Sequence, residues 1–467
     1  MMKRFVQVTF TVIAMLAITF TSAAAGNPFG DVTTTAGGYS TWDSDMINIE
    51  SVSETGSGVY VAVLDTGLVP NWSDYFPRER VATNLGTGFD QSVTFKAAGN
   101  QCQYDISVGP LRQTTWVGST GSSHGTHVAS TILGYFYRSN TDAAQGFPLP
   151  PIIVRGIAPD VTIIPVKVLS DYQVPALPKC TDPGPTPAHP VVFGTNGMVA
   201  AGIDYVTGLA NAGYKPIVIN MSLGDSSPSD EIEDAIDRAI AAGVIVVASA
   251  GNDGEAGMGW PGAYPQVISA GASGWIHEWL KPGTSVAVAN RYRMWWLQDG
   301  GDFTPPLLPG TGEVTDPTAV SDVYVTDFSS REFAGQELDV LAPGSWVRGP
   351  FPGDFNYSHL PWWSSGIGDL AGGNPGNFFY VGGTSMAAPH VTSAAALLLE
   401  KNSSLTQAQV ENILKTTALT IPASGSQTIL DNTVVATMSW DTDCEGTPCD
   451  AVGSGLLQVD AAIAATP

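Results

Sequence analysis

Short apolar runs alternate with amphipathic stretches from residue 59 onward. Residues 59–64 and 244–248 are continuous apolar runs, and residues 217–220 are apolar up to Asn220, which is typical of strands buried on both faces. Residues 232–242, 385–400 and 406–416 have the apolar spacing of helices, and Thr406 with Gln409 three residues later forms a capping box. This alternation predicts an α/β fold with a mostly parallel central sheet flanked by helices.

Four long segments without periodicity interrupt this pattern, at residues 139–151, 171–194, 275–325 and 349–379. They are rich in Gly, Pro or Trp, and no repeat or linker divides the chain, so we expect long loop insertions on one core. The third insertion carries a cluster of tryptophans: Trp275, Trp279, Trp295 and Trp296. Packing within the insertion is the favoured interpretation, and a substrate groove or partner surface is the alternative.

Residues 1–25 have the pattern of a secretory signal peptide. Lys3 and Arg4 precede an apolar stretch at residues 5–20, and Ala23-Ala24-Ala25 supplies a cleavage site. A retained membrane anchor is the alternative, but polar residues dilute the apolar stretch. We predict a secreted, extracellular protein with no membrane association after signal removal.

Acidic residues outnumber Lys and Arg by 43 to 19, which gives a formal net charge of −24. Loss of the two cations of the signal changes this value from −24 to −26. Such a charge disfavours binding to the phosphates of nucleic acids, so we predict no nucleic-acid partner. We also expect a monomer.

Four cysteines in a chain bound for an oxidising compartment predict two disulfides. Three pairings are possible. The insert at residues 445–448 is rich in turn formers, so pairing of Cys444 with Cys449 is favoured, which leaves Cys102 with Cys180. A zinc site is the competing interpretation, but the chain has no Cys-x-x-Cys pair and no histidine near its cysteines.

Three polar motifs lie where predicted elements begin or end. Asp65 closes a strand before Thr66-Gly67, His124 opens a helix in the run His-Gly-Thr-His, and Ser385 begins a helix after two glycines. Taken singly, the three residues have ordinary alternatives as a turn former, a paired-histidine metal ligand and a helix cap. The glutamate of a zinc-protease helix is missing between His124 and His127, so His127 is interpreted as structural.

Together, and in this order, the three motifs resemble the subtilisin-like serine protease (subtilase) family. Residues 156–159 with 166–169, 338–344 and 453–462 resemble further family segments, so the resemblance covers residue 57 to the end. The α/β-hydrolases are excluded because Ala387 replaces the second glycine of G-x-S-x-G. The acid-active sedolisins lack the His-Gly-Thr-His block and are a distant alternative.

The resemblance implies a subtilisin-like three-layer sandwich at residues 55–467, after a short N-terminal segment at 26–54. It implies a serine endopeptidase that hydrolyses protein or peptide bonds through an acyl-enzyme intermediate. Asp65 would orient His124, His124 would act as the base, and Ser385 as the nucleophile. Asn252, in Ser249-Ala250-Gly251-Asn252, would bind the oxyanion together with the backbone N–H of Ser385.

The resemblance also implies a substrate-binding region, for which we expect strand addition by main-chain hydrogen bonds. Its residues are those of the two backbone clamps and of the floor of the first pocket: Ser222, Leu223, Gly224, Ser249, Ala250, Gly251 and Gly259. Because Gly259 has no side chain, we expect a large apolar or aromatic residue before the cleaved bond, and Asp253 at the rim could also admit a basic one. Asp74 matches a calcium ligand, and its partner loop differs here around Asn140 and Asp142.

One departure from the family concerns the start of the chain. Secreted members commonly carry a folding prodomain of several tens of residues, whereas 39 residues separate Ala25 from Asp65. Either the protein folds unaided, or residues 26–54 act as a short inhibitory peptide that is removed. A catalytically silent, peptide-binding member of the fold is the alternative function, although all four catalytic residue types are present.

Overall fold

The central sheet contains nine strands within the described part of the chain. The structure is a computed structural model, and it describes residues 29–97, 102–118, 122–137, 152–177, 180, 187–276, 278, 296–297, 319–352, 378–431 and 434–467. The strand order is β16-β14-β13-β12-β2-β9-β3-β6, with β17 also paired to β14. All strands except β16 and β6 run parallel to their neighbours. The strands are β2 (Tyr60–Asp65), β3 (Thr87–Asp90), β6 (Arg112–Thr114), β9 (Thr162–Lys167), β12 (Ile217–Met221), β13 (Ile245–Ser249), β14 (Ile268–Trp275), β16 (Val323–Val325) and β17 (Val340–Pro343).

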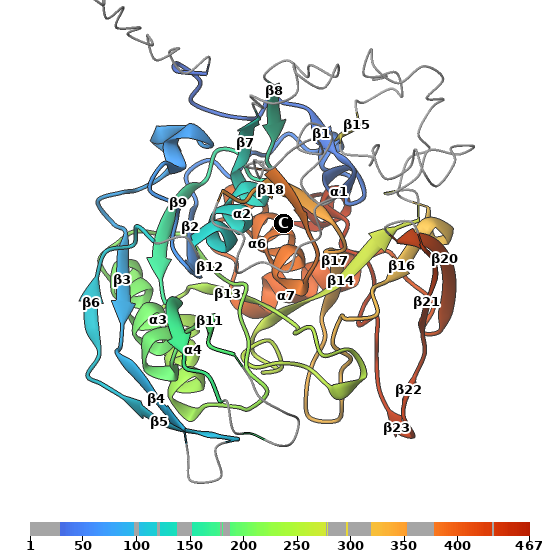
Figure 1. Cartoon of the computed structure of the whole chain (residues 1–467). Helices are drawn as coiled ribbons and strands as arrows, with labels where there is room; N and C mark the ends of the chain where they lie inside the picture. The colour runs from blue at the N-terminus through green and yellow to red at the C-terminus, as the bar shows by residue number, and fades with distance from the viewer. Residues whose placement is uncertain are drawn as a thin grey trace, which may run out of the picture. The chain divides into compact units, whose positions relative to one another are not determined.

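Helices cover both faces of this sheet, because its strands are apolar on both sides (Figure 1). Along β2, Val61 and Val63 pack with α2 (Ser123–Leu133), α6 (Thr384–Lys401) and α7 (Gln407–Thr417). Ala62 and Leu64 point to the other face, against α3 (Asn196–Asn211) and α4 (Asp230–Ala241). The predicted three-layer α/β fold is therefore confirmed, and the three predicted strands are the adjacent strands β2, β12 and β13.

Helix α6 lies within the core. Between Met386 and Leu399 every residue is buried, and many of them are alanines, which allow the close approach of α2 and the sheet. Helix α7 begins with the predicted capping box of Thr406 and Gln409. A helix enclosed by protein on all sides holds its first residues in fixed positions, and Ser385 is one of these.

Residues 42–52 belong to the core. Helix α1 (Trp42–Asp45) and the 3₁₀ turn η1 (Ile49–Ser51) bury Trp42, Met46, Ile47 and Ile49 almost completely. Asp43 contacts Nε2 of the buried His390 at 3.2 Å, and residues 32–467 form one compact unit. Burial of each of these apolar side chains stabilises the fold by about 1.5–3 kcal/mol. Removal of the whole 26–54 segment would lose this stabilisation, which argues against such a removal.

Two β-hairpins project beside β3 and β9 (Figure 1). Strands β4 (Val93–Ala97) and β5 (Tyr104–Val108) form one, and β10 (Ser170–Val174) and β11 (His189–Phe193) form the other. The ring of Phe193 lies 4.4 Å from that of Tyr172 and 6.2 Å from that of Phe95, so the two hairpins pack on each other. The second hairpin lies in residues 171–194, where the sequence predicts only an irregular insertion.

Both favoured disulfides are present. Cys102 pairs with Cys180 across 4.6 Å between Cα atoms, and Cys444 pairs with Cys449 across 5.9 Å. The first joins the segments between the strands of the two hairpins, and the second closes the small hairpin of β22 (Asp443–Cys444) and β23 (Thr447–Pro448). The predicted connectivity is therefore confirmed.

The remaining insertions are only partly described. Trp275 is completely buried beside Tyr324 and Met46, which confirms the packing interpretation for this tryptophan. The side chains of Trp279, Trp295 and Trp296 lie outside the described residues, as do residues 139–151 and the predicted signal peptide at 1–25. The other elements are β1 (Ser40–Thr41), β7 (Gly134–Tyr137), β8 (Ile152–Arg155), β15 (Trp296–Leu297), β18 (Val347–Pro350), β19 (Phe378–Val381), β20 (Gly425–Asp431), β21 (Val434–Trp440) and α8 (Val459–Ala465). Within the described ranges, no helix has the length and apolarity needed to span a bilayer.

Candidate active site

Asp65 is the last residue of β2 and its side chain is fully buried. Parallel sheets place functional groups at this carboxyl edge. The backbone N–H of Thr66 donates to Oδ1 of Asp65 at 2.6 Å. Gly67 then takes a positive φ of 80°, and a Cβ there would lie 2.1 Å from the carbonyl oxygen of Trp116. The turn after Asp65 therefore requires glycine, and this tight turn fixes the carboxylate.

His124 is the second residue of α2, and its ring is held against Asp65. Nδ1 lies 2.8 Å from Oδ1 and 3.0 Å from Oδ2 of the carboxylate, so Nδ1 is the donor. The first turn of α2 is tied to the loop after β2, because Gly125 N–H donates to Oγ1 of Thr66 at 2.9 Å. Val69 N–H likewise donates to Oγ1 of Thr126 at 3.0 Å. These bonds align the helix with the strand end and leave Nε2 of His124 as the basic nitrogen.

The environment of His124 tunes its basicity. Burial acts to lower the pKa of His124, but the charge of Asp65 and its hydrogen bond outweigh burial and raise the pKa above the ordinary value. The side chain of His124 is 29% exposed to solvent, so one edge of the ring remains accessible to a substrate. A histidine in this arrangement can accept a proton at Nε2 near neutral pH.

His127 has a different environment. It is fully buried, and its Nε2 lies 3.1 Å from the carbonyl oxygen of Val347 in β18. Burial, followed by the neighbouring His124, lowers the pKa of His127 to about 4, so the ring is neutral. Neither histidine belongs to a metal-ligand cluster among the described residues. His127 serves as packing between α2 and β18, which agrees with the structural interpretation.

Ser385 is the second residue of α6, and its backbone is positioned by an unexpected partner. Pro389, four residues later, lacks the N–H that would normally donate to the carbonyl oxygen of Ser385. The hydroxyl of Ser222, which follows β12, donates to that carbonyl oxygen at 2.7 Å instead. A residue expected only to bind substrate therefore also supports the serine.

The hydroxyl of Ser385 donates to the carbonyl oxygen of Ser222 at 3.3 Å. Its contact with His124 is not formed in this structure, in which the Asp65 carboxylate is the hydrogen-bond partner of the imidazole. Catalytic hydrogen bonds are often long or misaligned before substrate binds, and a rotation about χ1 redirects a serine hydroxyl. The structure thus holds two members of the predicted triad in direct contact, with the third on the adjoining helix.

Asn252, in the loop after β13, is oriented by Thr384. Its Oδ1 accepts from the backbone N–H of Thr384 at 2.8 Å and from the hydroxyl of Thr384 at 3.0 Å. Because the oxygen is occupied in this way, the NH₂ group of the amide is left to donate elsewhere. The first N–H groups of a helix also lack intrahelical partners, and Ser385 is in that turn. No role is predicted for Thr384 from the sequence. Its position between Gly383 and Ser385, within the serine motif, is the feature of the sequence that points to such a role.

The predicted substrate clamps lie on neighbouring strand ends. Ser222 to Gly224 follow β12. Ser249 is the last residue of β13, the next strand of the sheet, and Ala250 and Gly251 follow it. Gly259 N–H donates to the carbonyl oxygen of Ala250 at 2.8 Å, and a Cβ on Gly259 would lie 3.5 Å from the carbonyl oxygen of Asp225. Gly259 therefore lies between the two segments, as the predicted pocket floor would.

Calcium binding finds limited support among the described residues. Asp74, in the 3₁₀ turn Trp72–Asp74, accepts from Asn71 at 3.3 Å, and its expected partner loop lies outside the described residues. One cluster of carboxylates is found in the described ranges, formed by Glu337, Asp339 and Glu411. Lys415 occupies its centre, with Nζ 2.9 Å from Asp339 and 3.5 Å from Glu411. The ammonium of Lys415 is already paired with all three carboxylates, so this cluster does not fit a calcium ion. The role of Asp74 stays a prediction.

Comparisons with known proteins show the family of the chain. Residues 56–440 match the description "Subtilase family". The chain is 28% identical over 380 residues to "Subtilisin" of Bacillus pumilus, which covers 80% of this chain and 89% of that protein. It is 27% identical over 376 residues to "Subtilisin DY" of Bacillus licheniformis, covering 79% and 87% respectively.

Solved structures share the fold. "S41 Psychrophilic Protease" superposes with a TM-score of 0.50 at 22% identity, covering 91% of this chain and 99% of that one. "Sphericase" gives a TM-score of 0.50 at 23% identity, covering 90% and 98%. The family match spans most of the chain and the relatives align over most of their own length. The chain therefore belongs to the subtilase family and is a serine-type endopeptidase.

Proposed function

We propose that the chain is a secreted endopeptidase that uses Asp65, His124 and Ser385 as its triad, with Asn252 as an oxyanion donor. The observation that carries this proposal is the pair of hydrogen bonds from Nδ1 of His124 to the buried carboxylate of Asp65. This contact fixes the tautomer and leaves Nε2 free to act as a base.

The reaction follows from these positions. The hydroxyl of Ser385 turns from Ser222 to Nε2 of His124, gives up its proton, and its oxygen attacks the substrate carbonyl carbon. The NH₂ group of Asn252 and the N–H of Ser385 stabilise the oxyanion that forms. His124 then passes the proton to the leaving amine, the C–N bond breaks, and an acyl-enzyme remains. Water, deprotonated by His124, hydrolyses the ester and regenerates Ser385.

We propose that the substrate binds as an added strand between residues 222–224 and 249–251. These two segments lie at the carboxyl ends of adjacent parallel strands, so their backbone groups are presented on one edge of the sheet. Gly259 leaves the first pocket open, which supports a large apolar or aromatic residue before the cleaved bond. The signal pattern at residues 1–25 and the two disulfides support secretion.

A serine-directed phosphonate tests the catalytic proposal. We expect it to label the wild-type protein at Ser385, and to leave Ser385→Ala unlabelled and without activity on casein. Absence of labelling in a folded wild-type protein would instead favour the silent, peptide-binding alternative. Circular dichroism of both proteins verifies that the comparison is between folded molecules.

A further inference from the structure

Gly259, the expected floor of the first pocket, lies between two residues that are also held by hydrogen bonds. Gly259 N–H donates to the carbonyl oxygen of Ala250 at 2.8 Å, and Trp260 exchanges two hydrogen bonds of 2.8 Å with Asp225. Both contacts join main chain to main chain, so they do not depend on the identity of a side chain. The contact of the third residue, Met258, is of another kind.

The backbone of Met258 is held by the side chain of Gln336. Nε2 of Gln336 donates to the carbonyl oxygen of Met258 at 3.2 Å, and Oε1 accepts from the backbone N–H of Met258 at 3.0 Å. A primary amide carries a donor and an acceptor side by side, as a peptide unit does. The amide of Gln336 therefore takes the place that a neighbouring strand would have, and it fixes one end of the pocket floor.

Gln336 is itself held in place by a tight turn. Its Oε1 also accepts from the backbone N–H of Phe333 at 3.0 Å, and its own N–H donates to the carbonyl oxygen of Phe333 at 2.9 Å. The ring of Phe333 closes against Gly257, where a Cβ would lie 2.9 Å from a ring carbon and where φ is 99°. The amide is thus fixed before a substrate arrives.

The segment that carries Gln336, residues 328–336, also holds the part of the loop that contains Asn252. Ser330 donates its N–H to the carbonyl oxygen of Gly251 at 3.0 Å, and its hydroxyl accepts from the N–H of Asp253 at 3.0 Å. The buried Arg331 ties this segment together by donating to two of its nearby carbonyl oxygens. Loss of the Gln336 amide would therefore release the floor, while Ser330 would still hold both neighbours of Asn252.

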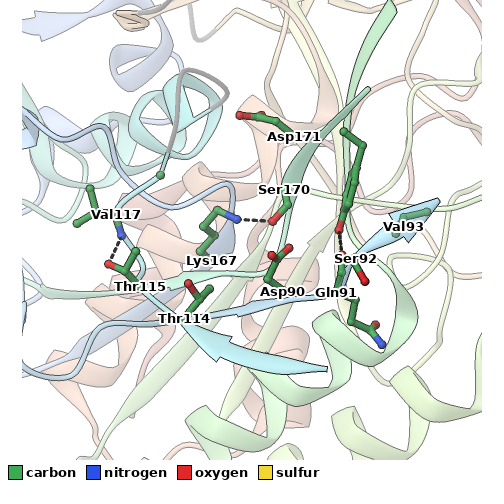
Figure 2. Close-up of a pocket in the computed structure, with 12 residues that line it drawn as sticks. Asp90, Gln91, Ser92, Val93, Thr114, Thr115, Val117, Lys167, Ser170 and Asp171 are labelled. Atoms are coloured by element: carbon green, nitrogen blue, oxygen red, sulfur yellow. Dashed lines mark hydrogen bonds between the residues drawn. The ribbon is translucent and has the colours of Figure 1, made fainter. Parts of the chain in front are cut away.

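A cavity of about 590 Å³ lies elsewhere on the same edge of the sheet, at the ends of β3, β6 and β9 (Figure 2). In the sheet, β2 and β9 lie on one side of β12, and β13 lies on the other. None of the residues that line this cavity belongs to residues 250–260 or to residues 328–336. A change at Gln336 should therefore act on the first pocket without altering this second space.

We propose that Gln336 is a positioning residue that determines specificity: by holding both backbone polar groups of Met258, it fixes the floor of the first pocket. The inference rests on the proposed function and extends it. An aromatic side chain that enters the pocket contacts the floor, and a floor that is already ordered costs less entropy on binding than one that the substrate must order. The methyl group of an alanine is too short to gain from this order.

Gln336→Met tests the proposal, because methionine keeps the length of the side chain and removes its donor and its acceptor. Two fluorogenic peptides differ only in having phenylalanine or alanine before the cleaved bond. We expect the ratio of kcat/KM for the phenylalanine peptide over the alanine peptide to fall about five- to tenfold, the value of one net hydrogen bond. The alanine peptide itself should be cleaved with nearly the wild-type kcat/KM.

Gln407→Met is the matched control. Gln407 makes the same paired contact with a backbone, since its Oε1 accepts from Val246 N–H at 2.8 Å and its Nε2 donates to the Val246 carbonyl oxygen at 3.0 Å. Val246 is near the amino end of β13, away from the substrate clamps at the other end of the strand. Gln407→Met should lower the thermal stability and leave the ratio of the two peptides unchanged.

A second variant keeps the test decisive if circular dichroism shows that Gln336→Met does not fold. Gln336→Glu keeps an acceptor for Met258 N–H but places an oxygen against the Met258 carbonyl, so its ratio should also fall below that of the wild type.

An unchanged ratio in the folded Gln336 variant would refute the inference, as would an equal fall in Gln407→Met. Cleavage of the alanine peptide and labelling of Ser385 in those cases keep the proposed function intact. A wild type that cleaves both peptides equally well would refute the first pocket and the role of Gln336 together. A wild type that cleaves neither peptide and is not labelled at Ser385 would refute the proposed function itself.

Discussion

At the scale of single residues, the contact between Asp65 and His124 links geometry to pH dependence. The base must be neutral to accept the serine proton, and Asp65 raises the pKa of His124 above its ordinary value. Activity should therefore be lost as the pH falls through this raised pKa. The acidic limb of kcat/KM for the wild type is expected above pH ~6.5, the ordinary pKa of histidine.

Asp65→Asn separates the two effects of this carboxylate. The amide removes the negative charge that raises the pKa of His124, so the acidic limb of kcat/KM should move to lower pH. The amide can also present its NH₂ group to Nδ1 and select the wrong tautomer, for which a loss of about 10⁴-fold in kcat is expected. A pH profile of kcat/KM from pH 4 to 9 measures both. An acidic limb that stays at the wild-type pH would contradict the assignment of His124 as the base.

Thr384 offers a test of how Asn252 is held. Asn252→Ala should lower kcat by about 10²- to 10³-fold with little change in KM, as the loss of one oxyanion donor does in a subtilisin. Thr384→Val removes the hydroxyl that bonds to Oδ1 of Asn252 and should cost about tenfold in kcat, the value of one hydrogen bond. Thr384→Ser keeps the hydroxyl and should restore most of the activity. Equal activity of the valine and serine variants would show that the hydroxyl of Thr384 does not orient Asn252.

The sequence predicts the candidate catalytic residues of this site better than it predicts the contacts that position them. Asp65, His124 and Ser385 are found because each lies where a predicted element begins or ends, within a recognisable motif. The second role of Ser222 depends on Pro389, since the missing N–H of Pro389 leaves the carbonyl oxygen of Ser385 to accept from Ser222. That relation joins residues 163 positions apart, and no local pattern reveals it.

At the scale of elements, the proposed first specificity pocket depends on the segments at the carboxyl ends of β12 and β13. A Cβ on Gly259 would make ordinary contacts of 3.5 Å or more, so Gly259→Ala should fold and keep its specificity. Gly259→Leu fills the space between the segments and should abolish cleavage after Phe and Tyr, while cleavage after Ala is retained. Mass spectrometry of the products from a peptide library measures both variants. An unchanged preference in Gly259→Leu would rule out this pocket.

The predicted and the missed elements differ in where their stability originates. Strands β2, β12 and β13 are continuous apolar runs because helices cover both faces, so the sequence alone indicates them. Strands β10 and β11 have no such run, and His189-Pro190 obscures the second. Their hairpin is held by Phe95 and by the disulfide to Cys102, both distant in sequence. Tertiary contacts of this kind cannot be inferred from local periodicity.

At the scale of the whole molecule, the two disulfides make unequal contributions to stability. Cys102 and Cys180 are 78 positions apart, and Cys444 and Cys449 are five positions apart. Closing a longer loop removes more entropy from the unfolded chain, and loop-closure arithmetic gives about 4.5 kcal/mol for the first bridge and about 2 kcal/mol for the second. Cys180 and Cys444 are similarly buried, so the penalty for a buried serine largely cancels between the two double variants.

Equilibrium unfolding in guanidinium measures this difference, with Ser385→Ala as the background so that self-digestion does not interfere. We expect Cys102→Ser/Cys180→Ser to lower the free energy of unfolding by about 2 kcal/mol more than Cys444→Ser/Cys449→Ser does. Equal losses of stability would show that the long loop between Cys102 and Cys180 is already restricted in the unfolded chain, and that the bridge acts mainly on the folded state.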